Sequence, residues 1–389
     1  MAESRRITLS ARLSGVAANA VARAARVFQR DRGPDVADRE VSRILVIELW
    51  NIGDVILAMP FLAALRTRFP RAKIALLGRS FAPELLAGTG LVDEFIVADL
   101  GWARGQGARW LGRITAVWNV SRTLRRHHFD IAYSARPHRR EHLLLSLSGA
   151  RRRIGLSVDT ADASLTDAVD APGEGRHKVE AWFRLLSPVA ITTRVAPSRL
   201  HVSDAERAWA RGFLQSRGVV KGNLVIGIHP GASLPEKRWS LDGFREIAVW
   251  LSTQPGVRVV VFAEPPPANY GVELFAVRGV IGAQTTLREL VALIEWCDLL
   301  VCNDSGPMHI AAALGVPTVA MFGAGIEEWF GPLGEGHERV LPDSGVAHRT
   351  IPTSQGEIRT PVGIGVAQVQ EAVERAVHRI RSSDKFSVP

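Results

Sequence analysis

Short apolar runs rich in β-branched residues alternate with longer amphipathic stretches from Arg43 onward, and this alternation restricts the fold more than any other feature of the chain. The pattern occurs twice. The strand candidates of the first half are 43–48, 73–77, 94–97 and 130–133, with helices expected after each of the first two, and those of the second half are Leu224–Ile228, Val257–Phe262, Val280–Ile281, Leu299–Cys302 and Thr318–Phe322. Strands that alternate with helices are typical of parallel sheets. The sequence therefore predicts an α/β protein with two Rossmann-like, doubly wound halves.

The length of the chain also favours two domains. Its 389 residues exceed the roughly 250–300 at which a single hydrophobic core usually stops growing. Ser187-Pro188 and Ala196-Pro197-Ser198 interrupt the alternating pattern, so we expect the halves to join between about 185 and 200. The predicted segments are a basic amphipathic N-terminal extension (1–40), a first Rossmann-like domain (41–190), a second one (191–365), and a C-terminal helix and tail (366–389).

The N-terminal extension has the pattern of a basic amphipathic helix. Residues 1–30 contain six arginines and one acid, Glu3, and the larger apolar residues recur at helical spacing. Two interpretations stay open: a peripheral contact with anionic lipid, or a helix packed on the protein surface. No apolar run approaches the roughly 18 residues that a membrane span needs. We expect a cytoplasmic protein, with the extension as a candidate contact to the inner membrane face.

The charge predicts an anionic partner. The formal net charge is +9 and the isoelectric point about 10.4. Residues 104–153 contain twelve arginines but only two acids, Asp130 and Glu141. This excess of positive charge would attract a phosphorylated or carboxylated acceptor, or else it forms a solvated basic face. Nucleic acid is not expected, because no nucleic-acid-binding motif accompanies the charge. Cys297 and Cys302 are expected to be buried thiols rather than a disulfide.

The first motif is the stretch from Arg43 to Val55, in which an apolar strand leads to Gly53 and Asp54 and then to a helix. Ligands of open α/β sheets bind at the carboxyl ends of the strands, which places Asp54 where a reacting group is expected. We predict that Gly53 forms a turn in which the backbone approaches a ligand closely. The alternative is that Asp54 only caps the helix.

The second motif follows the strand that ends near Ile228. A loop of small residues, His229-Pro230-Gly231-Ala232-Ser233, precedes Lys237 and a helix. Backbone N–H groups and an ammonium that converge on one anion would form a phosphate site, although a lysine without a ligand fits the pattern too. Glu264 follows the strand ending at Phe262, where related sheets bind ribose hydroxyls; an exposed loop glutamate is the alternative.

The third motif runs from Leu299 to Pro317. A strand ends in Asn303-Asp304, Ser305 or Gly306 caps a helix, Pro307 occupies its first position, and Gly315 and Pro317 end it. Such a helix start presents free N–H groups to an anion, and His309 in the first turn could reach the same anion. No Asp-x-Asp motif occurs, so the sequence implies neither a metal ion nor another cofactor.

Together the motifs resemble glycosyltransferase family 9, the lipopolysaccharide heptosyltransferases, from about residue 43 to 332. The matching elements are Gly53-Asp54 with Pro60, His229–Ala232 with Lys237-Arg238-Trp239, Asn303–His309, Phe322-Gly323, and Trp329-Phe330-Gly331-Pro332. The resemblance implies a GT-B fold with two domains facing a central cleft, an acceptor-binding first domain, a second domain that binds an ADP-sugar, and transfer with inversion to an anionic glycolipid or oligosaccharide such as lipopolysaccharide core.

The resemblance also assigns roles to individual residues. It implies that Asp54 is the general base and that Lys237 neutralises the departing diphosphate. The implied donor-binding residues are Gly231, Ser233, Lys237, Glu264, Asp304, Ser305, Gly306, Met308 and His309.

Two substrate-facing loops depart from the family pattern: Leu49-Trp50-Asn51-Ile52 replaces smaller residues, and Ala324–Glu328 replaces Pro-Thr. Alternatives to an ADP-sugar transferase therefore stay open. One is a non-catalytic nucleotide-binding or assembly protein. The others are a transferase that uses a UDP- or GDP-sugar, and a different two-domain sugar enzyme such as an epimerase.

Overall fold

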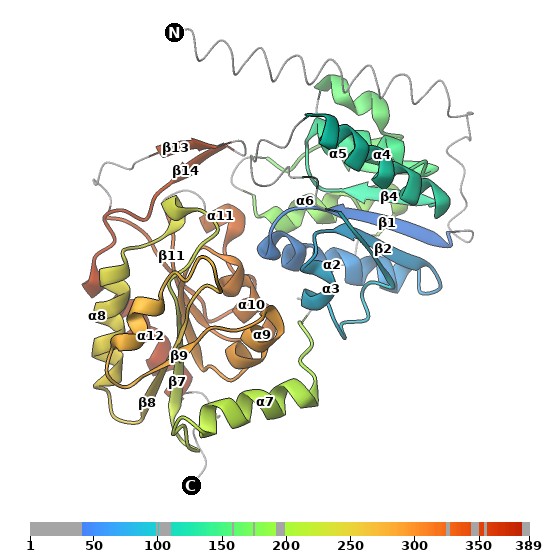
Figure 1. Cartoon of the computed structure of the whole chain (residues 1–389). Coiled ribbons are helices and arrows are strands. Elements are labelled where there is room, and N and C mark those ends of the chain that lie inside the picture. The colour runs from blue at the N-terminus through green and yellow to red at the C-terminus, as the bar shows by residue number, and fades with distance from the viewer. Residues whose placement is uncertain are drawn as a thin grey trace. The chain divides into compact units, whose positions relative to one another are not determined.

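The computed structural model describes residues 41–98, 100, 110–157, 159–173, 176–191, 199–323, 327–343, 350–353 and 356–382. The N-terminal extension (1–40) and residues 324–326 lie outside this range. The described residues divide into two compact units (Figure 1): unit 1 comprises those up to 83 and from 90 to 191, and unit 2 comprises 84–89 and those from 199 onward.

Unit 1 contains a parallel six-stranded sheet in the order β3-β2-β1-β4-β5-β6. Its strands are β1 (Arg43–Glu48), β2 (Lys73–Gly78), β3 (Glu94–Val97), β4 (Ile131–Ser134), β5 (Arg152–Leu156) and β6 (Asp167–Val169). This is the strand order of the dinucleotide-binding fold, in which the winding direction reverses between the first and fourth strands. Strands β5 and β6 were not predicted from the sequence pattern, because β5 begins with two arginines and β6 has only three residues.

Helices cover both faces of this sheet. They are α2 (Ile52–Arg68), α4 (Trp110–Arg126), α5 (Arg139–Leu147) and α6 (Lys178–Arg184), with 3-10 turns at Asp159–Ser164 and Ser187–Val189. The short helix α3 (Ala82–Leu85) spans the boundary between the two units in sequence. Alternate strand residues face opposite sides. Leu45 and Ile47 of β1 therefore pack in one cluster with residues of α4 and α5. On the other face, Phe61 of α2 contacts Tyr133 of β4 and Trp182 of α6.

Unit 2 repeats the same topology, with a parallel six-stranded sheet in the order β12-β11-β10-β7-β8-β9. Its strands are β7 (Leu224–His229), β8 (Val257–Phe262), β9 (Val280–Ala283), β10 (Leu299–Asn303), β11 (Thr318–Met321) and β12 (Glu338–Val340), and a separate antiparallel hairpin pairs β13 (Thr350–Thr353) with β14 (Gly356–Arg359). The winding reverses between β7 and β10, which pair directly.

The helices of unit 2 are α7 (Asp204–Gln215), α8 (Leu241–Ser252), α9 (Leu287–Glu295), α10 (Gly306–Leu314), α11 (Glu327–Phe330) and α12 (Val366–Ser382), with 3-10 turns at Pro235–Lys237 and Val272–Ala276. Helices α8 and α12 lie on one side of the strands, and α9 and α10 on the other (Figure 1). Val369 and Val373 of the C-terminal helix are fully buried in the core cluster of unit 2. Helix α12 is thus an integral part of this unit.

Local sequence signals explain several boundaries. Gly315 ends α10 with a φ of 77°, in the left-handed region that favours glycine, as predicted. Two details differ from expectation. Pro307 is the second residue of α10, because the helix begins at Gly306. Gly53 lies inside the first turn of α2 rather than in a separate turn, because the helix already begins at Ile52.

The two cysteines are free and buried, as predicted. Within the described ranges, every helix is too short or too polar to cross a lipid bilayer.

Candidate functional site

Both sheets place polar side chains after the strands at which the winding reverses. In unit 1 these strands are β1 and β4, and Asp54 and Arg136 follow them closely. In unit 2 they are β7 and β10, followed by Lys237 and Asp304. The carboxyl ends of strands at such a reversal are where open α/β sheets bind ligands. Each unit therefore has one candidate site edge.

Asp54 caps the start of α2 and also contacts an arginine. It lies in the first turn of α2, and its Oδ2 accepts a hydrogen bond of 3.1 Å from the backbone N–H of Asn51, which caps the helix start. Its Oδ1 accepts a hydrogen bond from Nη2 of Arg136. Asp54 is 8% exposed. A carboxylate held from both sides at a sheet edge is oriented well enough to serve as a base.

Arg136 is itself held by a buried network. Its guanidinium carbon lies 4.3 Å from the centre of the Trp50 ring, a cation–π distance. The Trp50 indole N–H donates to Oε1 of Glu141 over 2.6 Å, and the Ser134 hydroxyl donates to Oε2 of Glu141 over 2.5 Å. Glu141 is 1% exposed. Arg136, which contacts Asp54, is thus held in place by residues that lie near the ends of β1 and β4 and at the start of α5.

Glu48, the last residue of β1, adds a buried acid beside this network. It is 1% exposed, and its Oε1 accepts a hydrogen bond of 3.1 Å from the backbone N–H of Trp50. Burial, with repulsion from Asp54 and Glu141, raises the pKa of Glu48 to about 8, although Arg136 and Lys178 act in the opposite direction. Glu48 is therefore largely protonated in the folded protein near neutral pH.

This raised pKa predicts a pH-dependent stability. Between the ordinary pKa of 4.5 and the folded value of about 8, the folded state binds more protons than the unfolded state at this position. The free energy of unfolding should therefore fall as pH rises through this window. In Glu48→Gln this fall should be smaller, as measured by urea unfolding from about pH 5 to about pH 8. Glu246→Gln, at an exposed position of α8, is the control; identical pH profiles for wild type and Glu48→Gln would contradict the assignment.

The edge of unit 2 contains one cation, one carboxylate and one unpaired hydroxyl. The Lys237 ammonium lies 2.7 Å from Oδ2 of Asp304. Ser305, the residue before α10, has a buried hydroxyl with no hydrogen-bond partner among the described residues. Phe330 places its ring centre 5.8 Å from the Lys237 nitrogen. A cation, an unpaired hydroxyl and a helix start are suited to bind a phosphate group.

Asn303 fixes the loops of this edge to one another. It is fully buried and accepts a hydrogen bond of 2.9 Å from the backbone N–H of Trp239. Its amide group donates to the carbonyl oxygen of Pro230 over 2.7 Å. The last residue of β10 thus connects the loop after β7 with the segment that follows Lys237.

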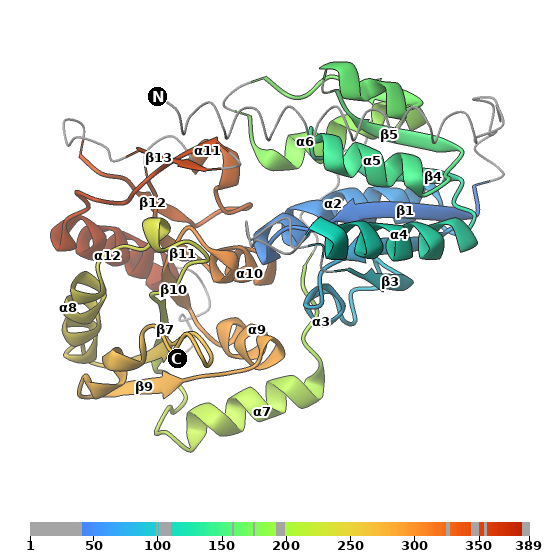
Figure 2. The same ribbon diagram turned by 45° about the horizontal axis from the view of Figure 1, so that its top comes forward.

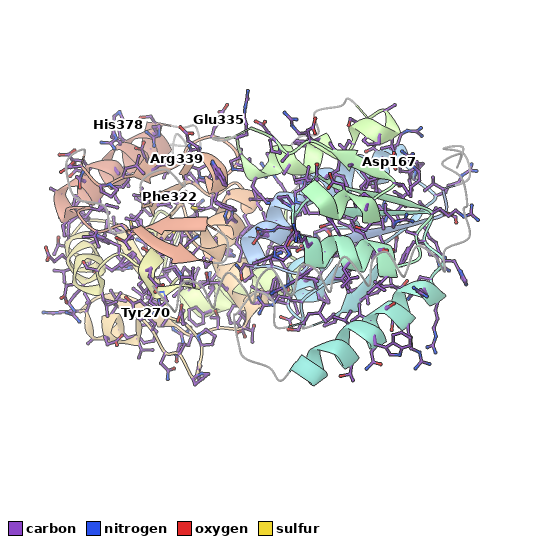
Figure 3. The ribbon with its side chains drawn as sticks, turned by 90° about the horizontal axis from the view of Figure 1, so that it is seen from above. Asp167, Tyr270, Phe322, Glu335, Arg339 and His378 are labelled. Carbon is purple, nitrogen blue, oxygen red and sulfur yellow. The ribbon has the colours of Figure 1, made fainter. Side chains whose placement is uncertain are left out.

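The carboxylate of Glu264 forms an ion pair with Arg238. Arg238 donates from Nη2 to both of its carboxylate oxygens over 3.2 Å, and the Arg238 guanidinium lies 4.1 Å from the ring centre of Tyr270, which is labelled in Figure 3. Gly231 faces the same carboxylate, because a Cβ at this position would lie 2.5 Å from Oε1 of Glu264. A larger residue at position 231 would therefore require the Glu264 carboxylate to move.

The remaining predicted residues of this edge differ in exposure. Ser233 is exposed, and Gly306 is partly exposed at the start of α10. His309 is 5% exposed in the first turn of α10, whereas Met308 is completely buried. The Met308 side chain therefore packs inside unit 2, and its contact with a donor stays a prediction.

Comparison with known proteins identifies the family. The model described as "Glycosyltransferase family 9 (heptosyltransferase)" matches residues 117–353, more than half of the 389 residues. This protein belongs to glycosyltransferase family 9. It is 28% identical over 308 residues to lipopolysaccharide heptosyltransferase 2 of Escherichia coli (strain K12), with 75% of this chain and 85% of the relative covered. Lipopolysaccharide heptosyltransferase 3 of the same strain is 29% identical over 287 residues, covering 70% and 80%.

Solved structures share the fold of this family 9 member. A family 9 glycosyltransferase from Veillonella parvula DSM 2008 superimposes with a TM-score of 0.72 at 24% identity, covering 87% of this chain and 97% of that chain. The E. coli ADP-heptose lipopolysaccharide heptosyltransferase II gives 0.67 at 23% identity, covering 87% and 100%. The predictions of an α/β protein with GT-B architecture and of a glycosyltransferase are thus confirmed.

Several residues around Asp54 in this glycosyltransferase were not predicted from the sequence. Glu48 directly follows the apolar run Ile44–Ile47, and Glu141 is one of two acids among twelve arginines. Each of these acids stands out from its surroundings in the sequence, and a buried acid needs a partner. Arg136 did not stand out, since its neighbours Arg139 and Arg140 look the same in the sequence.

Proposed function

We propose that this glycosyltransferase moves a heptose from an ADP-heptose donor, with inversion, to a hydroxyl group of an anionic cell-envelope glycolipid such as lipopolysaccharide core. The observation that carries the proposal is the Lys237–Asp304 pair, 2.7 Å apart, beside the unpaired hydroxyl of Ser305. The names of its relatives support the sugar and the acceptor: lipopolysaccharide heptosyltransferases 2 and 3. An E. coli heptosyltransferase of the same fold has been solved with ADP.

The proposal gives unit 2 the donor. The diphosphate would lie against Lys237 and the start of α10, where Ser305 and Gly306 offer a hydroxyl and backbone N–H groups. Glu264, held by Arg238, would accept hydrogen bonds from ribose hydroxyls. As the bond from the sugar to the phosphate breaks, negative charge grows on the leaving diphosphate. Fixed positive groups stabilise that charge more in the transition state than in the ground state.

The proposal gives unit 1 the acceptor. Oδ1 or Oδ2 of Asp54 would take the proton of the acceptor hydroxyl while that oxygen attacks the anomeric carbon. Since one displacement inverts the configuration, a single base is sufficient. Arg136, held by Trp50 and Glu141, would orient Asp54 and place positive charge beside an anionic acceptor. We expect the reaction on the cytoplasmic side of the membrane, where nucleotide-sugars are made.

A ligand screen followed by turnover tests the donor. At a hundred times its dissociation constant, ADP should stabilise the protein by about 2.7 kcal/mol, which is visible as a rise of a few degrees in Tm. UDP, GDP and CMP at the same concentration should give smaller rises. ADP-heptose with a lipopolysaccharide core acceptor should then release ADP. Selective stabilisation by UDP or GDP would overturn the proposed nucleotide, and no stabilisation by any nucleotide would overturn the donor site.

A further inference from the structure

Helix α4 exposes a stripe made of one tryptophan, three arginines and two small polar residues. The stripe residues, all exposed, are Thr115, Trp118, Asn119, Arg122, Arg125 and Arg126. Their spacing of three and four residues places them on one face of the helix. Trp118 is 64% exposed, more than any other large apolar side chain in the described part of the chain. A single exposed apolar side chain is ordinary on a protein surface; what distinguishes Trp118 is the three arginines on the same face of the helix.

The opposite face of α4 fixes the orientation of the stripe. Leu124 is fully buried in the core of unit 1, and Ala116, Val117 and Val120 pack against the same cluster. Figure 2 shows α4 on the outside of the unit 1 sheet. The stripe is therefore held outward by packing.

No acid on the stripe offsets its charge. Between residues 115 and 151 the only acids are Asp130 and Glu141, which are 6% and 1% exposed. Arg125 is anchored by a hydrogen bond of 3.1 Å from Nε to the carbonyl oxygen of Leu147. The result is a fixed positive face with an aromatic ring within it.

We propose that the exposed face of α4 docks on a bilayer that contains anionic phospholipid. The arginines would contact lipid phosphates, and Trp118 would enter the boundary between headgroups and acyl chains, where tryptophan is favoured. A water-soluble anion would explain the arginines but not the exposed indole, because it offers no apolar phase. The inference does not depend on the reaction that the protein catalyses, and its tests require no turnover.

Helix α7 provides a matched comparison. It also exposes a tryptophan, Trp209 (38% exposed), and it carries Arg211, but its first turn contains the acids Asp204 and Glu206. Replacing Trp209, Arg211 and Arg217, an exposed residue that lies just after α7, gives a control that loses as much positive charge as the test variant.

The first experiment is co-sedimentation of the full-length protein with vesicles of phosphatidylcholine alone or mixed equally with phosphatidylglycerol. Each arginine near an anionic surface strengthens binding about fivefold, so Arg122→Gln/Arg126→Gln should weaken binding to the mixed vesicles about 25-fold, and adding Trp118→Ala should weaken it further. The control, Trp209→Ala/Arg211→Gln/Arg217→Gln, should bind nearly as wild type. Residues 1–40 are present in every variant, so a difference reports on α4. Equal losses in the two sets would overturn the proposal.

The second experiment observes the helix directly. The native thiols are 5% and 0% exposed, so an environment-sensitive dye should label only an introduced cysteine. A dye at Asn119→Cys should brighten and shift to the blue with the mixed vesicles, whereas a dye at Val249→Cys on α8 should not. An unchanged signal at 119 while the protein sediments would place the contact elsewhere. The same shift with soluble glycerophosphate would identify a small-anion site instead, and either result would refute the docking face.

Discussion

Replacing Asp54 with asparagine should lower kcat by about 10²–10⁴-fold, the contribution typical of a positioned general base. The amide is nearly isosteric and can still accept a hydrogen bond from Arg136 or from the Asn51 backbone, but it cannot take a proton. ADP should still raise Tm as in wild type, because the proposed donor residues lie in unit 2. The measurement is the rate of ADP release at saturating donor and acceptor, alongside the ADP-induced change in Tm.

The chain offers a matched control for this change. Asp93 is also paired with an arginine, 2.6 Å from Arg66, and it also accepts a backbone hydrogen bond, from Ile74. It lies just before β3, at the amino end of its strand, so Asp93→Asn should cost stability without an effect on kcat of this size. Transfer at the wild-type rate by Asp54→Asn would remove Asp54 from the mechanism.

Much of the fold could be predicted because buried parallel strands leave a strong apolar signal. The expected 43–48 and Val257–Phe262 match β1 and β8, both of which pack between layers of helices. Strand β5 was not predicted, because its first residues, Arg152 and Arg153, interrupt the apolar pattern of a buried strand. Arg152 is satisfied by Asp167 of β6 over 2.7 Å, a partner that becomes a neighbour only in the folded sheet. A local pattern cannot show a pairing of this kind.

The site was predictable to the extent that single loops carry it. Lys237 and Asp304 were each identified from their own loop, and β7 and β10 bring them within 2.7 Å. The support of Asp54 was not predictable in this way, because it comes from Arg136, 82 residues away in sequence, which contacts Trp50. Trp50 was noted only as a departure from smaller residues. In the structure its indole connects a buried acid to the arginine that orients the proposed base.

The second large effect is expected at Lys237. Substitution with alanine should lower kcat by about 10²–10³-fold, comparable to the loss of one preorganised group that stabilises charge in the transition state, and it should remove most of the ADP-induced rise in Tm. The reason is that Lys237 would supply the cation opposite the leaving diphosphate. Lys221→Ala, at an exposed position of the same unit, removes the same charge and should change neither quantity.

The substitution has a structural consequence that must be measured separately. Asp304 is 7% exposed and would lose its ion pair in Lys237→Ala, which costs stability because a buried charge is left without a partner. The double variant Lys237→Ala/Asp304→Asn removes that charge and should recover stability. Because it still lacks the cation opposite the diphosphate, its turnover should stay low. Recovery of turnover together with stability would mean that Lys237 acts only by neutralising Asp304, and the leaving-group role would then be wrong.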